Sequence, residues 1–134
     1  MQWSGTPNAG FSDGTPWIMP PNNFKTINVQ MEEQDEDSIL NYYKTLIRLR
    51  KENPVISDGQ IEFLCGDCAD VFAYRRFLDG DELLVYNNLT GKEIVLTDAA
   101  WAVHGKKLIG NYEGIQDESN HLVLRPYESI VYRP

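Results

Sequence analysis

Cys65 and Cys68 are separated by two residues and form the most conspicuous chemical motif in the sequence. A redox-active Cys-x-x-Cys pair requires a strand-to-helix turn in a βαβ unit, because that turn lowers the pKa of a thiol. Here strand-like sequence lies on both sides of the motif. A zinc site would need two further ligands, and His104 and His121 are too far apart for zinc-finger spacing. We interpret the motif as a hairpin turn with incidental thiols, and we expect no metal and no cofactor.

The sequence contains no G-x-S-x-G, P-loop, H-E-x-x-H or dinucleotide-binding motif. The acidic residues between Glu32 and Asp37 have the composition of a metal-binding cluster, but the solvation of a helix end explains them more simply. We therefore predict no catalytic residue in this chain.

Aromatic and amide side chains are the residues that could bind a sugar. A flat ring packs against the C–H face of a pyranose, and amides offer both donors and acceptors to hydroxyl groups. Trp101, Tyr112 and Tyr127 are candidates, although burial in a core is the commoner fate of such residues. The segment 1–34 is the better place for sugar contacts, although its aromatic rings could instead hold a loop on a scaffold.

Segment 1–34 has the composition of a long ordered loop. It holds 11 Gly, Pro or Asn residues, and four prolines interrupt any helix or strand period. Before Glu32 it carries only two charged side chains, Asp13 and Lys25. A disordered linker would be richer in charge and poorer in large aromatic residues.

Residues 35–53 have the pattern of an amphipathic helix, with apolar residues three and four positions apart. Asp35 or Asp37 is the expected N-cap, and Asn53-Pro54 ends the helix. The expected stripe consists of Ile39, Leu40, Tyr43, Leu46, Ile47 and Arg50. Something must cover this stripe, because a helix of this length is marginally stable alone.

Residues 54–134 change to strand-like patterns. Asp79-Gly80 lies between two apolar runs and predicts a two-residue hairpin. Strands are expected at 60–64, 71–74, 83–86, 93–96, 107–111, 121–124 and 129–132. About seven strands without an intervening helix indicate an antiparallel β-sandwich. The predicted fold class is mainly β, a sandwich preceded by one amphipathic helix and a long ordered or partly ordered loop.

The net charge, the apolar runs and the number of cysteines exclude some binding partners and cellular compartments. The formal net charge of −8 disfavours nucleic acid and anionic membrane surfaces. No run of 18 apolar residues could span a bilayer, and the N-terminus lacks the features of a signal peptide. Two cysteines make no disulfide framework, so a reducing compartment is the default. We expect a cytoplasmic protein.

Several motifs occur in one order along the whole chain. They are Met-Gln-Trp at 1–3, Asn-Ala-Gly-Phe at 8–11, Pro-Trp at 16–17, Ile-Asn-Val at 27–29, the helical run 37–55, Leu-Ile-Gly-Asn-Tyr at 108–112 and Leu-Arg-Pro-Tyr-Glu-Ser at 124–129. Together they resemble the α-amylase superfamily, glycoside hydrolase family 13. The resemblance is to its α-glucosidase branch, which includes oligo-1,6-glucosidase and trehalose-6-phosphate hydrolase.

The resemblance implies that the chain is a C-terminal piece of an enzyme roughly four times longer, built on a (β/α)8 barrel. Residues 1–53 would be a remnant of the barrel, namely the loop after its last strand and its last helix at about 35–53. Residues 54–134 would be the C-terminal antiparallel β domain. The implied substrate-loop residues are Gln2, Trp3, Asn8 and Phe11, and the implied barrel-packing helix residues are Ile39, Tyr43, Leu46 and Ile47.

The family cleaves α-glucosidic bonds with retention, which requires two carboxyl groups about 5 Å apart. In the family these groups and a third aspartate lie upstream, and the Asn-His-Asp motif of the third is absent from this sequence. The resemblance therefore implies a non-catalytic fragment of an intracellular α-glucosidase-type enzyme of carbohydrate metabolism. Its β domain would stabilise the catalytic barrel.

The expected partners are the missing barrel of the same enzyme and, through it, an α-glucoside or oligosaccharide. Exposed apolar surface could also drive self-association of the fragment. The alternative is an autonomous carbohydrate-binding β-sandwich module.

Overall fold

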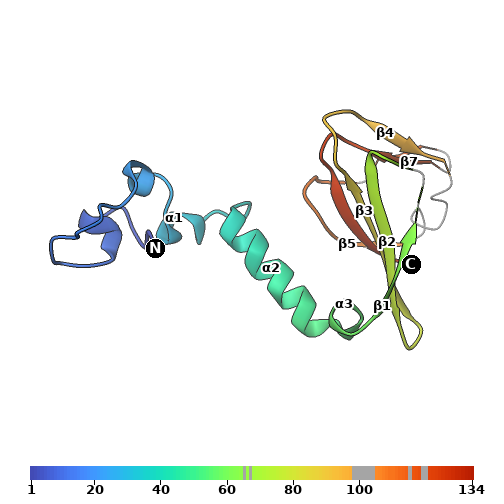
Figure 1. Cartoon of the computed structure of the whole chain (residues 1–134), viewed down its shortest axis with the longest axis horizontal. Coiled ribbons are helices and arrows are strands. Elements are labelled where there is room, and N and C mark those ends of the chain that lie inside the picture. The colour runs from blue at the N-terminus through green and yellow to red at the C-terminus, as the bar shows by residue number, and fades with distance from the viewer. Residues whose placement is uncertain (65, 67, 98–104, 115, 119–120) are drawn as a thin grey trace. The chain divides into compact units, whose positions relative to one another are not determined.

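The computed structural model describes residues 1–64, 66, 68–97, 105–114, 116–118 and 121–134. The chain forms two compact units, Met1–Glu52 and Asn53–Pro134. The first contains short helices and one longer helix, and the second contains the strands (Figure 1).

The first unit begins with three short helices inside the predicted loop: η1 (Pro7–Gly10), η2 (Asn22–Lys25) and α1 (Val29–Glu32). Asn28 caps α1, because its side chain accepts a hydrogen bond from the backbone N–H of Met31 at 3.0 Å. The backbone N–H groups of Val29 and Gln30 donate to the carbonyl oxygens of Gln2 and Trp3 at 2.9 and 3.0 Å. The N-terminal segment is therefore tied to the start of α1.

The long helix α2 (Ile39–Glu52) confirms the predicted amphipathic helix, but it begins later than residue 35. The prediction that Asp35 or Asp37 caps it is wrong. The Ser38 hydroxyl accepts a hydrogen bond from the backbone N–H of Asn41 at 3.1 Å, whereas the carboxylate of Asp35 accepts from the N–H of Asp37 at 3.0 Å. Ser38 is also buried. The aspartates thus form a turn that precedes the cap.

The second unit starts with the short helix α3 (Pro54–Ser57), which the sequence pattern did not predict. Its strands are β1 (Gln60–Leu64), β2 (Val71–Leu78), β3 (Asp81–Asn88), β4 (Ile94–Leu96), β5 (Lys106–Gly110), β6 (Gln116–Glu118), β7 (His121–Leu124) and β8 (Ser129–Arg133). One sheet has the order β1-β2-β3-β8-β5 and the other has the order β4-β7-β6, and all pairings are antiparallel (Figure 1).

The hairpin predicted at Asp79-Gly80 is confirmed. It joins β2 to β3, and both turn residues have positive φ, 50° and 88°. Positive φ at both positions is the requirement of a type I′ turn, whose twist matches that of paired strands. The strands on either side are longer than expected, because their mixed polar residues still pair along the full hairpin.

The hydrophobic core lies between the two sheets. Its buried residues are Val71, Ala73, Leu84, Tyr86, Leu122, Leu124, Ile130 and Tyr132, and Ile94 and Leu96 of β4 pack against them. Residues of β2, β3 and β8 thus face residues of β4 and β7. This arrangement confirms the predicted antiparallel sandwich.

Helix α3 covers part of the other face of the five-stranded sheet. Val55 is buried, and the guanidinium group of Arg76 on β2 donates to the carbonyl oxygens of Val55 and Gly59 at 3.0 and 2.8 Å. Leu83 lies opposite Arg76 in the register, so its side chain is on the face away from the core. It is nevertheless buried. This face therefore has a partial cover of its own.

The two ends of the second unit are in contact. The guanidinium group of Arg133, on the last strand, donates to the side-chain oxygen of Asn53 at 2.6 Å. It also forms an ion pair of 3.2 Å with Asp81 at the start of β3. These contacts join the first residue of the unit to its last strand.

Candidate functional site

A tight reversal of the chain positions the predicted substrate loop. Asn8, Ala9 and Gly10 are three consecutive residues in the left-handed region, with φ of 55°, 57° and 66°. The carbonyl oxygen of Ala9 accepts the backbone N–H groups of Trp3 and Ser4 at 2.8 and 3.1 Å. Ala9 is buried, so the reversal is fixed both by hydrogen bonds and by packing.

The two amide side chains predicted for the loop are engaged in holding it. The Asn8 amide nitrogen donates to the carbonyl oxygens of Ser12 and Gly14 at 2.8 and 2.9 Å. The Gln2 amide nitrogen donates to the side-chain oxygen of Asn23 at 2.9 Å. These donors therefore organise the loop from within.

Three of the four predicted loop residues line one hollow of about 210 Å³. Its wall consists of Met1, Gln2, Asn8, Phe11, Ser12, Pro16, Ile18, Pro20 and Pro21. Trp3 lies outside this lining and is half-exposed. A neighbouring, more polar hollow of about 540 Å³ shares Asn8 and Phe11 and adds Asp13.

This arrangement is suited to binding rather than to bond cleavage. The exposed ring of Phe11 lines the hollow beside the amide side chains of Gln2 and Asn8, whose carbonyl oxygens are acceptors for hydroxyl groups. Asp13 is the only carboxylate in the two linings. Glycoside hydrolysis needs a pair of carboxyl groups, so the two hollows do not contain that machinery.

Helix α2 carries an exposed apolar stripe. Ile39, Tyr43, Leu46 and Ile47 are 79%, 62%, 39% and 47% exposed. Their spacing of four, seven and eight residues places them on one side of the helix. The only ion pair involving this helix among the described residues joins Lys44 to Glu33 at 2.9 Å. The stripe is thus a large apolar surface that the first unit leaves open.

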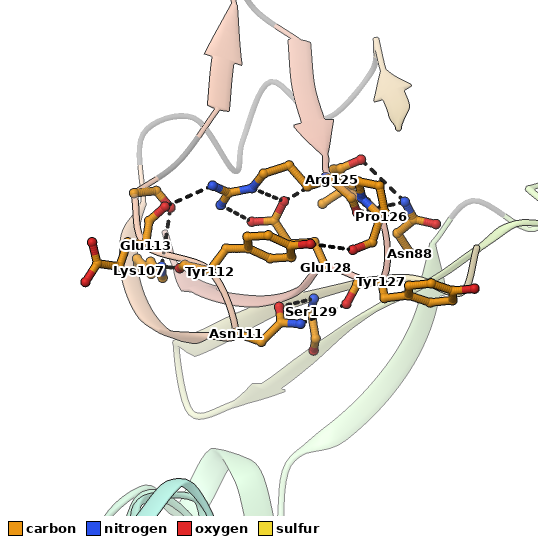
Figure 2. Close-up of polar contacts among 12 residues, drawn as sticks. Asn88, Lys107, Asn111, Tyr112, Glu113, Arg125, Pro126, Tyr127, Glu128 and Ser129 are labelled. Carbon is orange, nitrogen blue, oxygen red and sulfur yellow. Dashed lines mark hydrogen bonds and ion pairs between the residues drawn. The ribbon is translucent and has the colours of Figure 1, made fainter. Parts of the chain in front are cut away.

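A second polar cluster lies at the end of β7 (Figure 2). The guanidinium group of Arg125 donates to both carboxylate oxygens of Glu128, at 2.7 and 3.0 Å, and the backbone N–H of Arg125 adds a bond of 2.8 Å. Burial raises the pKa of Glu128, but the hydrogen bonds and the charge of Arg125 outweigh it and hold this pKa below its ordinary value. Glu128 is therefore a buried, charged carboxylate.

Tyr112, one of the rings considered for sugar stacking, belongs to the same cluster. The Arg125 guanidinium lies 4.3 Å from the centre of the Tyr112 ring, and the Tyr112 hydroxyl donates to the carbonyl oxygen of Pro126 at 2.9 Å. The ammonium group of Lys107 donates to the carbonyl oxygen of Tyr112 (Figure 2). One face of this ring is thus covered by a cation.

Tyr127, in contrast, is exposed. Its backbone has a φ of 56°, and its N–H donates to the carbonyl oxygen of Thr90 at 2.9 Å. Trp101 lies outside the described residues. Of the two rings that the structure describes, Tyr127 is the more exposed, at 65% against 36% for Tyr112.

The Cys-x-x-Cys motif lies in the connection between β1 and β2, as the hairpin interpretation predicted. Cys65 lies outside the described residues, as does His104. Cys68 is disulfide-bonded and packs against the core, so the interpretation of Cys68 as an incidental thiol is wrong. Within the described parts of the chain no group of three or more His, Cys, Asp or Glu residues is placed to hold a metal ion. No described helix is long and apolar enough to cross a membrane.

Comparison with known proteins identifies both parts of the chain. The family model "Alpha amylase, catalytic domain" matches residues 1–59, and the model "Alpha-amylase SusG C-terminal domain" matches residues 71–131. A probable oligo-1,6-glucosidase 2 of Bacillus subtilis is 40% identical over 98% of this chain and 24% of its own length.

Solved structures give the same result. The trehalose-6-phosphate hydrolase of Bacillus licheniformis has a TM-score of 0.81 at 40% identity, covering 98% of this chain and 24% of the other. An isomaltulose synthase from Klebsiella sp. LX3 has a TM-score of 0.83 at 35% identity, with the same coverage. The chain belongs to the α-amylase family, glycoside hydrolase family 13, and corresponds to the C-terminal region of its oligo-1,6-glucosidase and trehalose-6-phosphate hydrolase branch. It spans about a quarter of the length of these relatives.

Proposed function

We propose that this chain is the non-catalytic C-terminal part of an intracellular α-glucosidase-type glycoside hydrolase. Residues 1–53 complete the catalytic barrel, and residues 54–134 form a β domain that stabilises it. The complete enzyme acts on α-glucosidic bonds in carbohydrate metabolism. The relatives that carry these activities in their names support the choice of reaction class.

The observation that carries the proposal is the exposed stripe on α2. Four apolar side chains between 39% and 79% exposed would gain free energy on burial, at about 25 cal/mol per Å² of apolar area. An isolated helix of this length is marginally stable in water. A barrel that covers Ile39, Tyr43, Leu46 and Ile47 supplies the missing tertiary packing.

The substrate contribution of this region is the loop around Asn8. Gln2, Asn8 and Phe11 line a hollow in the loop that follows the last barrel strand in the family resemblance. Loops at this end of barrel strands form the active site in (β/α)8 enzymes. We propose that these residues, with Trp3, border the α-glucoside, while the catalytic carboxylates come from the rest of the enzyme.

A chimeric enzyme tests the proposal. The chain replaces the matching C-terminal residues of the probable oligo-1,6-glucosidase 2 of Bacillus subtilis, and turnover of a chromogenic α-glucoside is measured. We expect turnover by the chimera and none by the 134-residue chain alone. A folded chimera without activity, or turnover by the chain alone, would contradict the proposal.

Substitution on α2 tests the role of the stripe in the same chimera. Ile39→Ser with Tyr43→Ser should lower the temperature at which activity is lost. Arg48→Ala is the matched control, because Arg48 is exposed and lies nine residues from Ile39, on the opposite side of the helix. An equal effect of the two changes would argue against burial of the stripe.

The alternative is an autonomous carbohydrate-binding module. The exposed ring of Tyr127 favours it, whereas the cation over Tyr112 removes one face of a second ring. Titration calorimetry of the chain with maltose- and isomaltose-type glucans separates the two functions. Saturable heat that Tyr127→Ala abolishes would support the module, and its absence would reject it.

A further inference from the structure

The larger of the two hollows in the N-terminal loop is polar and carries a single charge. Its volume of about 540 Å³ lies within the range of about 300–1,000 Å³ that is typical of ligand sites. Its polar lining consists of Ser4, Thr6, Asn8, Ser12 and Asp13. Asp13 is the only ionisable side chain in the lining, and it is exposed. The hollow therefore offers hydroxyl, amide and carboxylate groups to a ligand.

The N–H donors in and beside this lining are engaged within the loop. The backbone N–H of Thr6 donates to the hydroxyl oxygen of Ser4 at 3.4 Å. The backbone N–H of Gly14 donates to the hydroxyl oxygen of Ser12 at 3.0 Å. The amide nitrogen of Asn8 has two N–H bonds, and it uses them on the carbonyl oxygens of Ser12 and Gly14. These donors stabilise the loop and are not available to a ligand.

The side-chain oxygens of Asn8 and Asp13 are, in contrast, unengaged acceptors. Neither oxygen group has a hydrogen-bond or ion-pair partner among the described residues. Lys25 is the only other charged side chain before Glu32, and it lies in η2, outside both linings. No lysine or arginine of the loop is therefore paired with the Asp13 carboxylate.

Unengaged acceptors beside a carboxylate favour one class of ligand. A neutral sugar carries hydroxyl groups that donate to carboxylate and amide oxygens, and hydrogen bonds to an ionised acceptor are the stronger ones. A phosphate group is itself a negatively charged acceptor, and proteins bind it with cations or with free N–H groups. The lining supplies no cation, and a carboxylate repels the phosphate charge.

We propose that Asp13 selects neutral α-glucosides against phosphorylated ones in the complete enzyme. This inference rests on the proposed function and names the substrate class of the same loop. Overall similarity does not decide between the two classes. A probable oligo-1,6-glucosidase 2 and a trehalose-6-phosphate hydrolase, both of Bacillus subtilis, are 40% and 38% identical to this chain. A carboxylate in the ligand-binding loop does distinguish them, because it acts on the charge of the substrate.

A second chimera tests the inference. The chain replaces the matching C-terminal residues of the trehalose-6-phosphate hydrolase of Bacillus subtilis, and kcat/KM is measured for trehalose 6-phosphate and for a chromogenic α-glucoside. Asp13→Asn should raise the ratio of the phosphorylated to the neutral value by about tenfold, because it removes the like charge and keeps the shape of the side chain. A ratio that stays the same or falls would overturn the inference.

Glu36→Gln is the matched control for this measurement. It removes one negative charge from an exposed side chain of the same unit, outside both linings. We expect the substrate ratio of this variant to equal that of the parent chimera. An equal rise in Glu36→Gln and Asp13→Asn would mean that net charge alone sets the ratio, and would overturn the role of Asp13.

The salt dependence separates an effect of charge from a change in the shape of the loop. The screening length falls from about 10 Å at 0.1 M salt to about 3 Å at 1 M. The effect of Asp13→Asn on the substrate ratio should therefore shrink as the salt concentration rises across this range. An effect of the same size at both concentrations would come from loop structure and would overturn the inference.

The two proposals fail in different ways. An active chimera whose substrate ratio does not respond to Asp13→Asn would reject this inference and leave the proposed function standing. A chimera that is folded by circular dichroism but turns over neither substrate would reject the proposed function and, with it, the selection by Asp13.

Discussion

The guanidinium group of Arg125 holds the buried carboxylate of Glu128 by two hydrogen bonds, of 2.7 and 3.0 Å. The same guanidinium donates to the carbonyl oxygen of Glu113 at 3.0 Å and lies over the ring of Tyr112. The Arg125 side chain therefore holds residues 112–113, which precede β6, against residues 125–128, which follow β7 (Figure 2).

Removing the charge of Glu128 should destabilise the β domain. Glu128→Gln leaves the Arg125 guanidinium without its anionic partner in a buried site, and we expect a loss of about 3 kcal/mol. Glu62→Gln breaks the exposed pair with Arg75 and should cost much less, because solvent screens an exposed pair. Urea unfolding of both variants gives the two values. Equal losses would mean that the buried pair has no special role.

The lowered pKa of Glu128 predicts a loss of stability in acid. Its carboxylate stays charged in the folded state below its ordinary pKa of 4.5, so the folded state binds the proton less tightly than the unfolded state. The stabilisation is present above the ordinary pKa and is lost as the pH falls through the folded-state pKa. Urea unfolding between about pH 7 and pH 3 should show this loss in the parent and a weaker one in Glu128→Gln. Parallel curves would contradict it.

The raised pKa of Tyr86 predicts a loss of stability at high pH. Burial, with a further contribution from Glu82, raises the pKa of its hydroxyl to about 12. The unfolded state loses this proton first, so stability is present below the ordinary pKa of 10.0 and falls as the pH rises toward about 12. Tyr86→Phe should remove this group's contribution to the alkaline loss. Urea unfolding at high pH, with tyrosinate absorbance followed in parallel, checks it. If Tyr86→Phe lost as much stability at high pH as the parent, the loss would belong to another group.

Gly10 predicts a local effect in the substrate loop. Its φ is 66°, and a Cβ atom there would lie 2.4 Å from the Ser4 hydroxyl oxygen. Gly10→Ala should loosen the reversal and speed hydrogen exchange at the N–H groups of Trp3 and Ser4 by about tenfold, because a left-handed alanine costs about 1–2 kcal/mol. Gly14→Ala is the control, since its Cβ would have ordinary contacts. Equal exchange rates in the two variants would contradict the prediction.

Local sequence was sufficient for the parts of the fold that depend on local patterns. Asp79-Gly80 sets the central hairpin because both residues tolerate positive φ. The apolar spacing of Ile39, Tyr43 and Leu46 sets the face of α2. The family resemblance of the motifs along the chain is likewise visible in the residues alone and agrees with the comparisons.

The parts that sequence reasoning missed depend on contacts between distant residues. Helix α3 is held by Arg76, which lies 21 residues after Val55. The periodicity of the local sequence does not predict a contact over that separation. Asn28 caps α1 while its amide nitrogen donates to the carbonyl oxygen of Phe24. Arg125 and Glu128 are three residues apart, a spacing that was visible, but the burial that gives their pair its weight was not.

The contact between Arg133 and Asn53 gives the β domain a property of its own. The side chains of Asn53, the first residue of this unit, and of Arg133, its penultimate residue, meet at 2.6 Å, so a short linker can join the two ends without spanning the domain. New ends could then be opened at the exposed Asp79-Gly80 turn, where the chain reverses without help from the core. The β domain is therefore organised so that its connectivity can be rearranged by circular permutation while every strand pairing apart from the opened turn is kept.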